Sequence, residues 1–138
     1  MTVTRAIAAT AMFAGLAVGA ASPAWADQTM SGHYIMTLTT STEYSSNQDL
    51  YFIPCGDGCA TVWPGNAQAH LVNGQWTMDA AGPVFCPDYT SVPDALTILY
   101  SWDPNTLAGT ARIEYRVAAC GSPQGTTQTH DLQLTQAP

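Results

Sequence analysis

The chain has 138 residues, with ten acidic and three basic side chains, no lysine, and a formal net charge of −7. Three arginines cannot supply the phosphate contacts on which nucleic-acid binding depends, nor a basic patch for an anionic membrane surface. Because 46% of the residues are hydrophobic and 9% are charged, the composition is that of a folded domain and excludes a highly charged, disordered chain.

The first 26 residues have the three-part pattern of a secretory signal peptide. Arg5 precedes an apolar stretch over 6–20, and a small-x-small cleavage sequence follows at 24–26. About 15 apolar residues are too few to cross a bilayer, which takes about 20, so we expect no membrane anchor after cleavage. The sequence therefore predicts a secreted, extracellular chain that begins at Asp27 and, without Arg5, carries a formal charge of −8.

After this segment, apolar residues alternate with polar ones at a period of two, and no sustained helical period is present. Turn residues divide the first part of this region into strands over 32–41, 49–55 and 59–63, with a polar loop over 42–48. In the first strand, Tyr34, Met36 and Leu38 share one face, which we expect to be buried.

The clearest local signal is a β-hairpin that joins strands over 67–72 and 75–78. Asn73 and Gly74 accept the positive φ that both central positions of a type I′ turn require. A two-residue turn fixes the register, which pairs Val72 with Gln75, Leu71 with Trp76, His70 with Thr77, and Ala69 with Met78. The four apolar residues then share one face, so the turn and the alternation agree on the same hairpin.

Residues 80–93 contain one glycine and three prolines, which interrupt a hydrogen-bonded ladder, so we expect a loop tethered at Cys86. The remaining strands are expected over 95–102, 107–119 and 126–136, joined by turns at 103–106 and 121–125. Asp103 and Pro104 occupy the first two positions of a type I turn. In the last strand, Leu132 and Leu134 are expected to point inward.

Seven or eight short strands joined by sequential turns predict an all-β fold, a single antiparallel meander over 27–138. A meander of this size closes into a small barrel or folds into a β-sandwich. Lysine often protects the exposed edge of a sheet, and this chain has none. We therefore favour the barrel, because closure removes edges, with the β-sandwich as the alternative.

Disulfide bonds are expected because all four cysteines lie in the exported part: Cys55, Cys59, Cys86 and Cys120. Of three possible pairings we favour Cys55–Cys59 and Cys86–Cys120, since the glycines between the first two cysteines let a short loop turn back. By loop-closure entropy the short ring is worth about 2 kcal/mol and the longer ring about 4 kcal/mol. Redox dithiols usually read Cys-x-x-Cys, and no ligand set completes a zinc site, so we expect structural bridges.

No motif in the sequence indicates catalysis. His33, His70 and His130 lack the spacing of a metal motif, and there is no nucleophile elbow. The aspartates beside glycine or proline are typical of turns: Asp57, Asp88, Asp94 and Asp103. We therefore expect no enzyme activity, no metal and no cofactor. Paired carboxylates for glycoside cleavage stay open, because their spacing is spatial rather than sequential.

Aromatic side chains are the candidates for contact with a ligand or partner. The four residues singled out for this role are Trp63, Trp76, Tyr100 and Trp102. Aromatic residues on inward faces either fill the core or line a cavity that binds an apolar ligand. Trp63 adjoins Pro64 at a turn, so we expect it to be the most exposed of the four.

Three runs of the exported part carry a family resemblance: Trp102-Asp103-Pro104-x-Thr106-Leu107-x-Gly109-Thr110, Pro54-Cys55-Gly56-x-Gly58-Cys59-Ala60, and Ala119-Cys120-Gly121. The chain resembles the small exported, cysteine-bridged proteins of mycobacteria and related actinobacteria, which are largely uncharacterised. The likeness covers most of the exported part. It implies export, two bridges and a β architecture, and it implies no substrate and no catalytic residue.

We therefore predict a secreted, non-enzymatic binding or interaction module on a disulfide-stapled β scaffold, whose partner is a protein, a glycan or a small apolar ligand. One alternative is a carrier that holds a small apolar ligand in a barrel cavity. Another is an extracellular hydrolase with an unrecognised site. A filled interior argues against the carrier, and the lack of a cleft with converging titratable groups argues against the hydrolase.

Processing can be tested on the full-length chain expressed in a secreting host. We expect the exported protein to begin at Asp27 and to contain two disulfides and no free thiol. Intact mass under non-reducing conditions, with and without alkylation, measures both properties. Retention of residues 1–26 or an alkylated cysteine would contradict the prediction.

Overall fold

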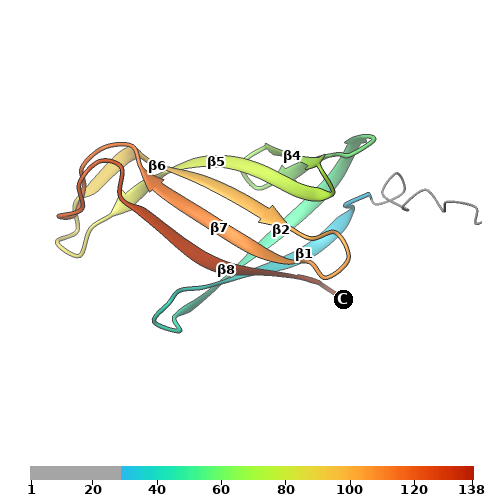
Figure 1. Ribbon diagram of the computed structural model, residues 1–138, viewed down its shortest axis with the longest axis horizontal. Coiled ribbons are helices and arrows are strands. Elements are labelled where there is room, and N and C mark those ends of the chain that lie inside the picture. The colour runs from blue at the N-terminus through green and yellow to red at the C-terminus, as the bar shows by residue number, and fades with distance from the viewer. Residues whose placement is uncertain (1–28) are drawn as a thin grey trace, which may run out of the picture.

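The computed structural model describes residues 29–138, so the predicted signal peptide lies outside the described residues. The strands are β1 (Gly32–Thr39), β2 (Ser45–Gly56), β3 (Cys59–Trp63), β4 (Ala67–Val72), β5 (Gln75–Phe85), β6 (Ser91–Trp102), β7 (Ala108–Tyr115) and β8 (Thr127–Gln136). Each strand pairs antiparallel with the next, and β8 pairs with β1, so the sheet closes into a barrel (Figure 1). The predicted all-β meander barrel is confirmed, and the β-sandwich alternative is wrong.

Membrane-spanning helices were not expected. Within residues 29–138 the structure contains no helix that is both long enough and apolar enough to span a bilayer.

The predicted loop over 42–48 is partly wrong, because β2 begins at Ser45. Ser45 and Asn47 lie opposite Thr39 and Thr37 of β1, and the hydroxyl of Thr37 donates a hydrogen bond of 2.9 Å to the side-chain oxygen of Asn47. Cross-strand pairs of this kind stabilise a ladder without apolar residues. The alternation of apolar residues therefore underestimates the length of this strand.

The predicted loop over 80–93 is also wrong, because β5 continues to Phe85 and β6 already begins at Ser91. The register of these two strands shifts between Gly82 and Val84. Pro83 lies at this irregularity, where a residue that cannot donate a ladder hydrogen bond is tolerated. Proline and glycine here mark a bulge in a long hairpin.

At its C-terminal end β7 is shorter than predicted and stops at Tyr115 instead of residue 119. The hairpin of β4 and β5 has the predicted register, with Leu71 opposite Trp76 and Ala69 opposite Met78. Asn73 and Gly74 have φ values of 49° and 81°, as a type I′ turn requires. Turn chemistry and alternation together determine this part of the fold.

Both predicted disulfides are present, Cys55–Cys59 and Cys86–Cys120, with Cα atoms 5.1 Å and 5.3 Å apart. None of the described cysteines is free. The longer bridge ties the turn between β5 and β6 to the segment that follows β7. Two disulfides are typical of proteins in an oxidising compartment.

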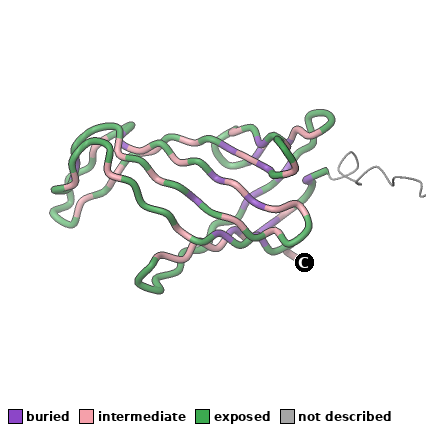
Figure 2. The backbone as a smooth tube through the Cα atoms, in the orientation of Figure 1, coloured by how far each residue is buried: buried purple, intermediate pink, exposed green. Residues whose placement is uncertain are grey.

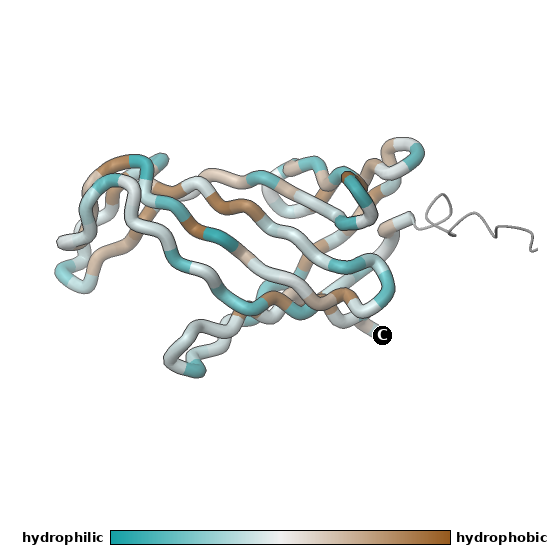
Figure 3. Tube along the Cα trace, viewed as in Figure 1, coloured by the Kyte–Doolittle hydropathy of each residue, from teal (hydrophilic) through white to brown (hydrophobic). Residues whose placement is uncertain are grey.

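The core fills one half of the barrel with aromatic rings. Trp76 and Trp102 are 0% and 1% exposed, and their rings stack with centroids 6.4 Å apart. The ring of Phe52 packs edge-on against Trp102. Buried residues run along the barrel body, whereas the hairpin tips at the left of Figure 2 are exposed. Figure 3 shows hydrophobic and hydrophilic residues alternating along β6 and β7, as expected for strands with one face inward.

The other half of the barrel has an incomplete wall. β3 pairs with residues 51–56 of β2, and β4 pairs with residues 75–78 of β5. Among the described residues, 45–50 of β2 therefore pair with β1 alone, and 79–85 of β5 pair with β6 alone. We call this interruption of the ladder the window. The expectation that closure removes every sheet edge is thus wrong at the window.

The backbones of β6 and β7 approach closely where Trp102 lies opposite Gly109. A Cβ atom at Gly109 would overlap the carbonyl oxygen of Ser101 and the Cα of Trp102. Neither atom belongs to a flexible side chain, so a larger residue requires the backbone to move.

We expect Gly109→Ala to lower the free energy of unfolding by about 3 kcal/mol or more, because a methyl group at this position displaces backbone atoms. Gly82→Ala is the matched control, since its Cβ would meet no atom within 4 Å, and it should change stability by less than about 0.5 kcal/mol. Urea denaturation measures both variants. Equal stability of the two variants would contradict the close approach.

The turn between β6 and β7 is held by Asp103, as its type I sequence predicts. The carboxylate accepts hydrogen bonds from the backbone N–H groups of Thr106 and Asn105, at 2.9 Å and 2.7 Å. These bonds lower the pKa of Asp103 below its ordinary value of 3.8, and the bond from Thr106 has the larger effect. A carboxylate whose pKa is lower in the folded than in the unfolded state stabilises the fold above the unfolded pKa.

This contribution should be lost as the pH falls through the lowered pKa of Asp103. In Asp103→Asn the amide oxygen still accepts the turn hydrogen bonds but does not titrate. We expect the wild type to be the more stable protein above about pH 4, and the difference to shrink as the pH falls from about 4 to about 2. Urea midpoints across this range measure it, and a difference that does not change with pH would contradict the role of the charged form.

Candidate functional site

A pocket of about 360 Å³ opens into the barrel at the window. Its lining comes from the first six strands and the turn between β3 and β4: Met36, Gln48, Leu50, Val62, Pro64, Gly65, Ala67, Met78, Asp79, Ala80, Ala81 and Tyr100. Small-molecule sites in proteins usually have volumes of about 300–1,000 Å³. The pocket is therefore large enough for one compact ligand.

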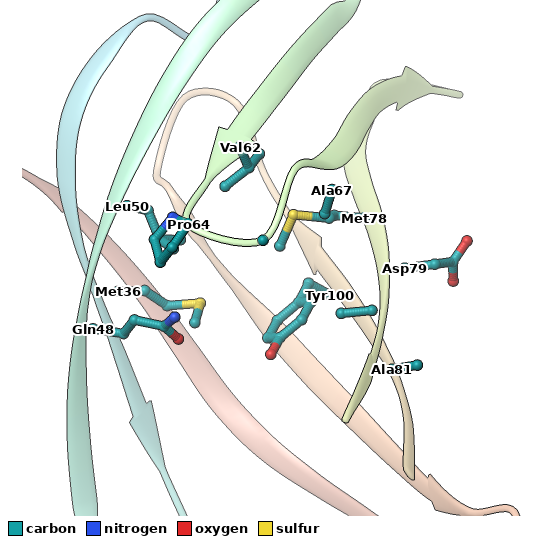
Figure 4. A pocket seen from close by; sticks show the side chains of 12 residues that line it. Met36, Gln48, Leu50, Val62, Pro64, Ala67, Met78, Asp79, Ala81 and Tyr100 are labelled. Carbon is teal, nitrogen blue, oxygen red and sulfur yellow. The ribbon is translucent and has the colours of Figure 1, made fainter. Parts of the chain in front are cut away.

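The floor of the pocket consists of inward-facing apolar side chains. Met36, Leu50, Val62 and Met78 are all buried members of the hydrophobic core. In Figure 4 the thioether groups of Met36 and Met78 lie on opposite sides of the pocket. Methionine is unbranched and polarisable, so such a floor adapts to ligands of different shape.

Two features leave this half of the barrel hollow. Ala67 and Ala80 are the inward-facing residues of β4 and β5 at this level, and their methyl groups fill little of the interior. The turn at Pro64 and Gly65 follows the end of β3 and precedes the start of β4, so neither strand extends across the window. In the other half, two tryptophan rings occupy the corresponding space.

Few polar groups face the pocket. The hydroxyl of Tyr100 points toward the side where Met36 and Gln48 lie, and Gln48 places its amide at the exposed rim (Figure 4). The carboxylate of Asp79 points away from the pocket in the same view, so this residue lines it through its backbone. Burial raises the pKa of Tyr100 above its ordinary value of 10, so the phenol stays protonated and able to donate.

The four aromatic candidates lie in three different places. Trp76 and Trp102 are packed in the core, and their indole N–H groups have no hydrogen-bond partner among the described residues. Trp63 is 54% exposed, the most exposed of the four, as its position beside Pro64 predicts. Tyr100 alone of the four lines the pocket.

Sequence reasoning missed several residues of the pocket. It placed Met36 and Met78 on inward faces but gave them no role in binding. The strands predicted beside 59–63 and 67–72 are 49–55 and 75–78, which are about as short, so strand length in the sequence does not point to a gap in the wall. The gap appears in the structure, where β2 and β5 have twelve and eleven residues and β3 and β4 have five and six.

The histidines do not converge. His33 lies 2.8 Å from a carboxylate oxygen of Asp49 on the outside of the barrel, and its ring stacks on Tyr51 with centroids 4.4 Å apart. His130 pairs with Ala111 near the opposite end of β8. Among residues 29–138, no three His, Cys, Asp or Glu side chains gather in a way that would hold a metal ion.

A second exposed apolar feature lies at the tip of the hairpin formed by β5 and β6. Tyr89 is fully exposed there, and the nearby Phe85 is largely exposed. The tip is closed by the backbone hydrogen bonds of Cys86, which donates to Thr90 and accepts from Tyr89. The disulfide at Cys86 connects this tip to the rest of the chain, so its aromatic side chains are carried on a braced turn.

The comparisons with known proteins assign no family to the chain. No protein-family model, no curated protein and no solved structure matches it.

Proposed function

We propose that the protein is a non-enzymatic binding module that holds a small, mainly apolar molecule in the pocket of its barrel. The proposal rests on one observation. The buried side chains of Met36, Leu50, Val62 and Met78 form an apolar floor to the pocket, which is open at the window. Apolar surface that leaves water for such a floor contributes about 25 cal/mol per Å². Among the functions that the sequence left open, this supports the carrier of an apolar ligand.

The same geometry gives less support to a hydrolase. A nucleophile needs a base within hydrogen-bond distance, and a third group to orient that base. The titratable side chains of the described pocket lining are Tyr100 and Asp79, and the carboxylate of Asp79 points away. His33 and Asp49, which pair with each other, do not line the pocket.

We also propose that binding takes place outside the cell. The pattern of the first 26 residues predicts export, and the two disulfides are of the kind that persists in an oxidising compartment. A formal charge of −8 after processing keeps such a module soluble. Contact with a protein or a glycan through Trp63 stays a prediction from the sequence.

Binding can be tested with 1-aminoanthracene, a neutral aromatic dye whose fluorescence rises in an apolar site. We expect saturable binding to the processed, oxidised protein. In Ala80→Phe an inward aromatic ring fills the pocket, so the affinity should fall at least about tenfold.

The matched control is Thr97→Phe, an exposed residue of β6 that lies opposite Ala81 and does not line the pocket. This variant should bind the dye as the wild type does. Absence of binding to the wild type, or equal losses in both variants, would contradict the proposed function.

A further inference from the structure

The hydroxyl of Tyr100 is a hydrogen-bond donor that faces the pocket and is accessible from it. Tyr100 is 7% exposed and belongs to the hydrophobic core. None of the described residues forms a hydrogen bond with its hydroxyl, whereas the ring is surrounded by the apolar side chains of the floor. A ligand that covers this hydroxyl without accepting its hydrogen bond leaves a desolvated donor, which is costly, whereas a ligand with an acceptor oxygen avoids that cost.

The pocket offers no partner for an anion. No lysine, arginine or histidine is among its lining residues, and the chain as a whole is acidic. A carboxylate that enters this apolar floor loses its water without gaining a cation, which is costly. A cation gains little electrostatic stabilisation in the pocket, because the carboxylate of Asp79 is turned away from the interior.

The second polar side chain of the lining is Gln48, at the exposed rim on β2. Its amide both donates and accepts hydrogen bonds, so it tolerates many polar groups and selects weakly among them. Tyr100 lies deeper and has a single donor. Selection among ligands of similar shape therefore depends on Tyr100 rather than on Gln48.

From these observations we infer that the ligand is an uncharged, mainly apolar molecule with one hydrogen-bond-accepting oxygen, such as a ketone, ester or alcohol, which binds the hydroxyl of Tyr100. This inference rests on the proposed function and adds to it the chemical class of the ligand. In this role Tyr100 determines specificity, whereas the methionine and aliphatic floor supplies most of the affinity.

Three naphthalenes of similar shape test the inference by displacing 1-aminoanthracene: 2-acetylnaphthalene, 2-isopropylnaphthalene and the anion 2-naphthoate. The acetyl compound carries the acceptor oxygen, and the isopropyl compound replaces it with a methyl group. For the wild type we expect the acetyl compound to bind about fivefold more tightly than the isopropyl compound. The naphthoate should bind at least about tenfold more weakly than the acetyl compound.

In Tyr100→Phe the preference for the acetyl over the isopropyl compound should be lost or reversed, because the ketone then leaves water without gaining a hydrogen bond. Tyr34→Phe is the matched control, because Tyr34 is a buried tyrosine of the same core that does not line the pocket. It should keep the fivefold preference. Circular dichroism checks that both variants retain the β fold.

The outcomes separate the two proposals. If none of the three compounds binds the wild type, both the proposed function and this inference are overturned. If they bind, but the preference survives in Tyr100→Phe or the naphthoate binds as tightly as the ketone, the inference alone is overturned. Loss of the preference in Tyr100→Phe and not in Tyr34→Phe supports it.

Discussion

Strand length is the constraint on which the rest of this structure depends. β3 and β4 have five and six residues, whereas β2 and β5 on either side of them have twelve and eleven. A barrel wall is complete only where every strand has a partner on both sides, so the short pair closes one half and leaves the window in the other. The pocket lies at this window because the ladder stops there.

The two halves of the interior then have different roles. In the closed half, the rings of Trp76, Trp102 and Phe52 fill the barrel, and Gly109 lets the backbone come close to them. Interiors packed in this way resist change, and single substitutions there are costly. In the open half, the lining is adaptable and partly unfilled. The packed aromatic core and the pocket are thus separated along the barrel axis.

How far the sequence predicts this arrangement depends on the kind of signal. The hairpin at Asn73 and Gly74 is predicted pair by pair, because turn chemistry and alternation specify the same register. The bulge at Pro83 and the polar start of β2 are not predicted from the sequence, because local propensity disfavours a strand at both places. Pairing with β6 stabilises the first, and pairing with β1 stabilises the second. Tyr100 is a candidate for ligand contact from the sequence only because it is aromatic. Its role in a pocket depends on a window that becomes visible only when all eight strands are paired.

The division of the barrel into a filled and a hollow half is tested most directly by a crystal of the processed protein pressurised with xenon. Xenon enters apolar cavities of protein interiors that lack other occupants. Electron density for xenon is expected between Met36, Met78 and Tyr100, with none beside the stacked rings of Trp76 and Trp102. Xenon beside the tryptophans, or a pocket closed by repacked side chains, would contradict this division.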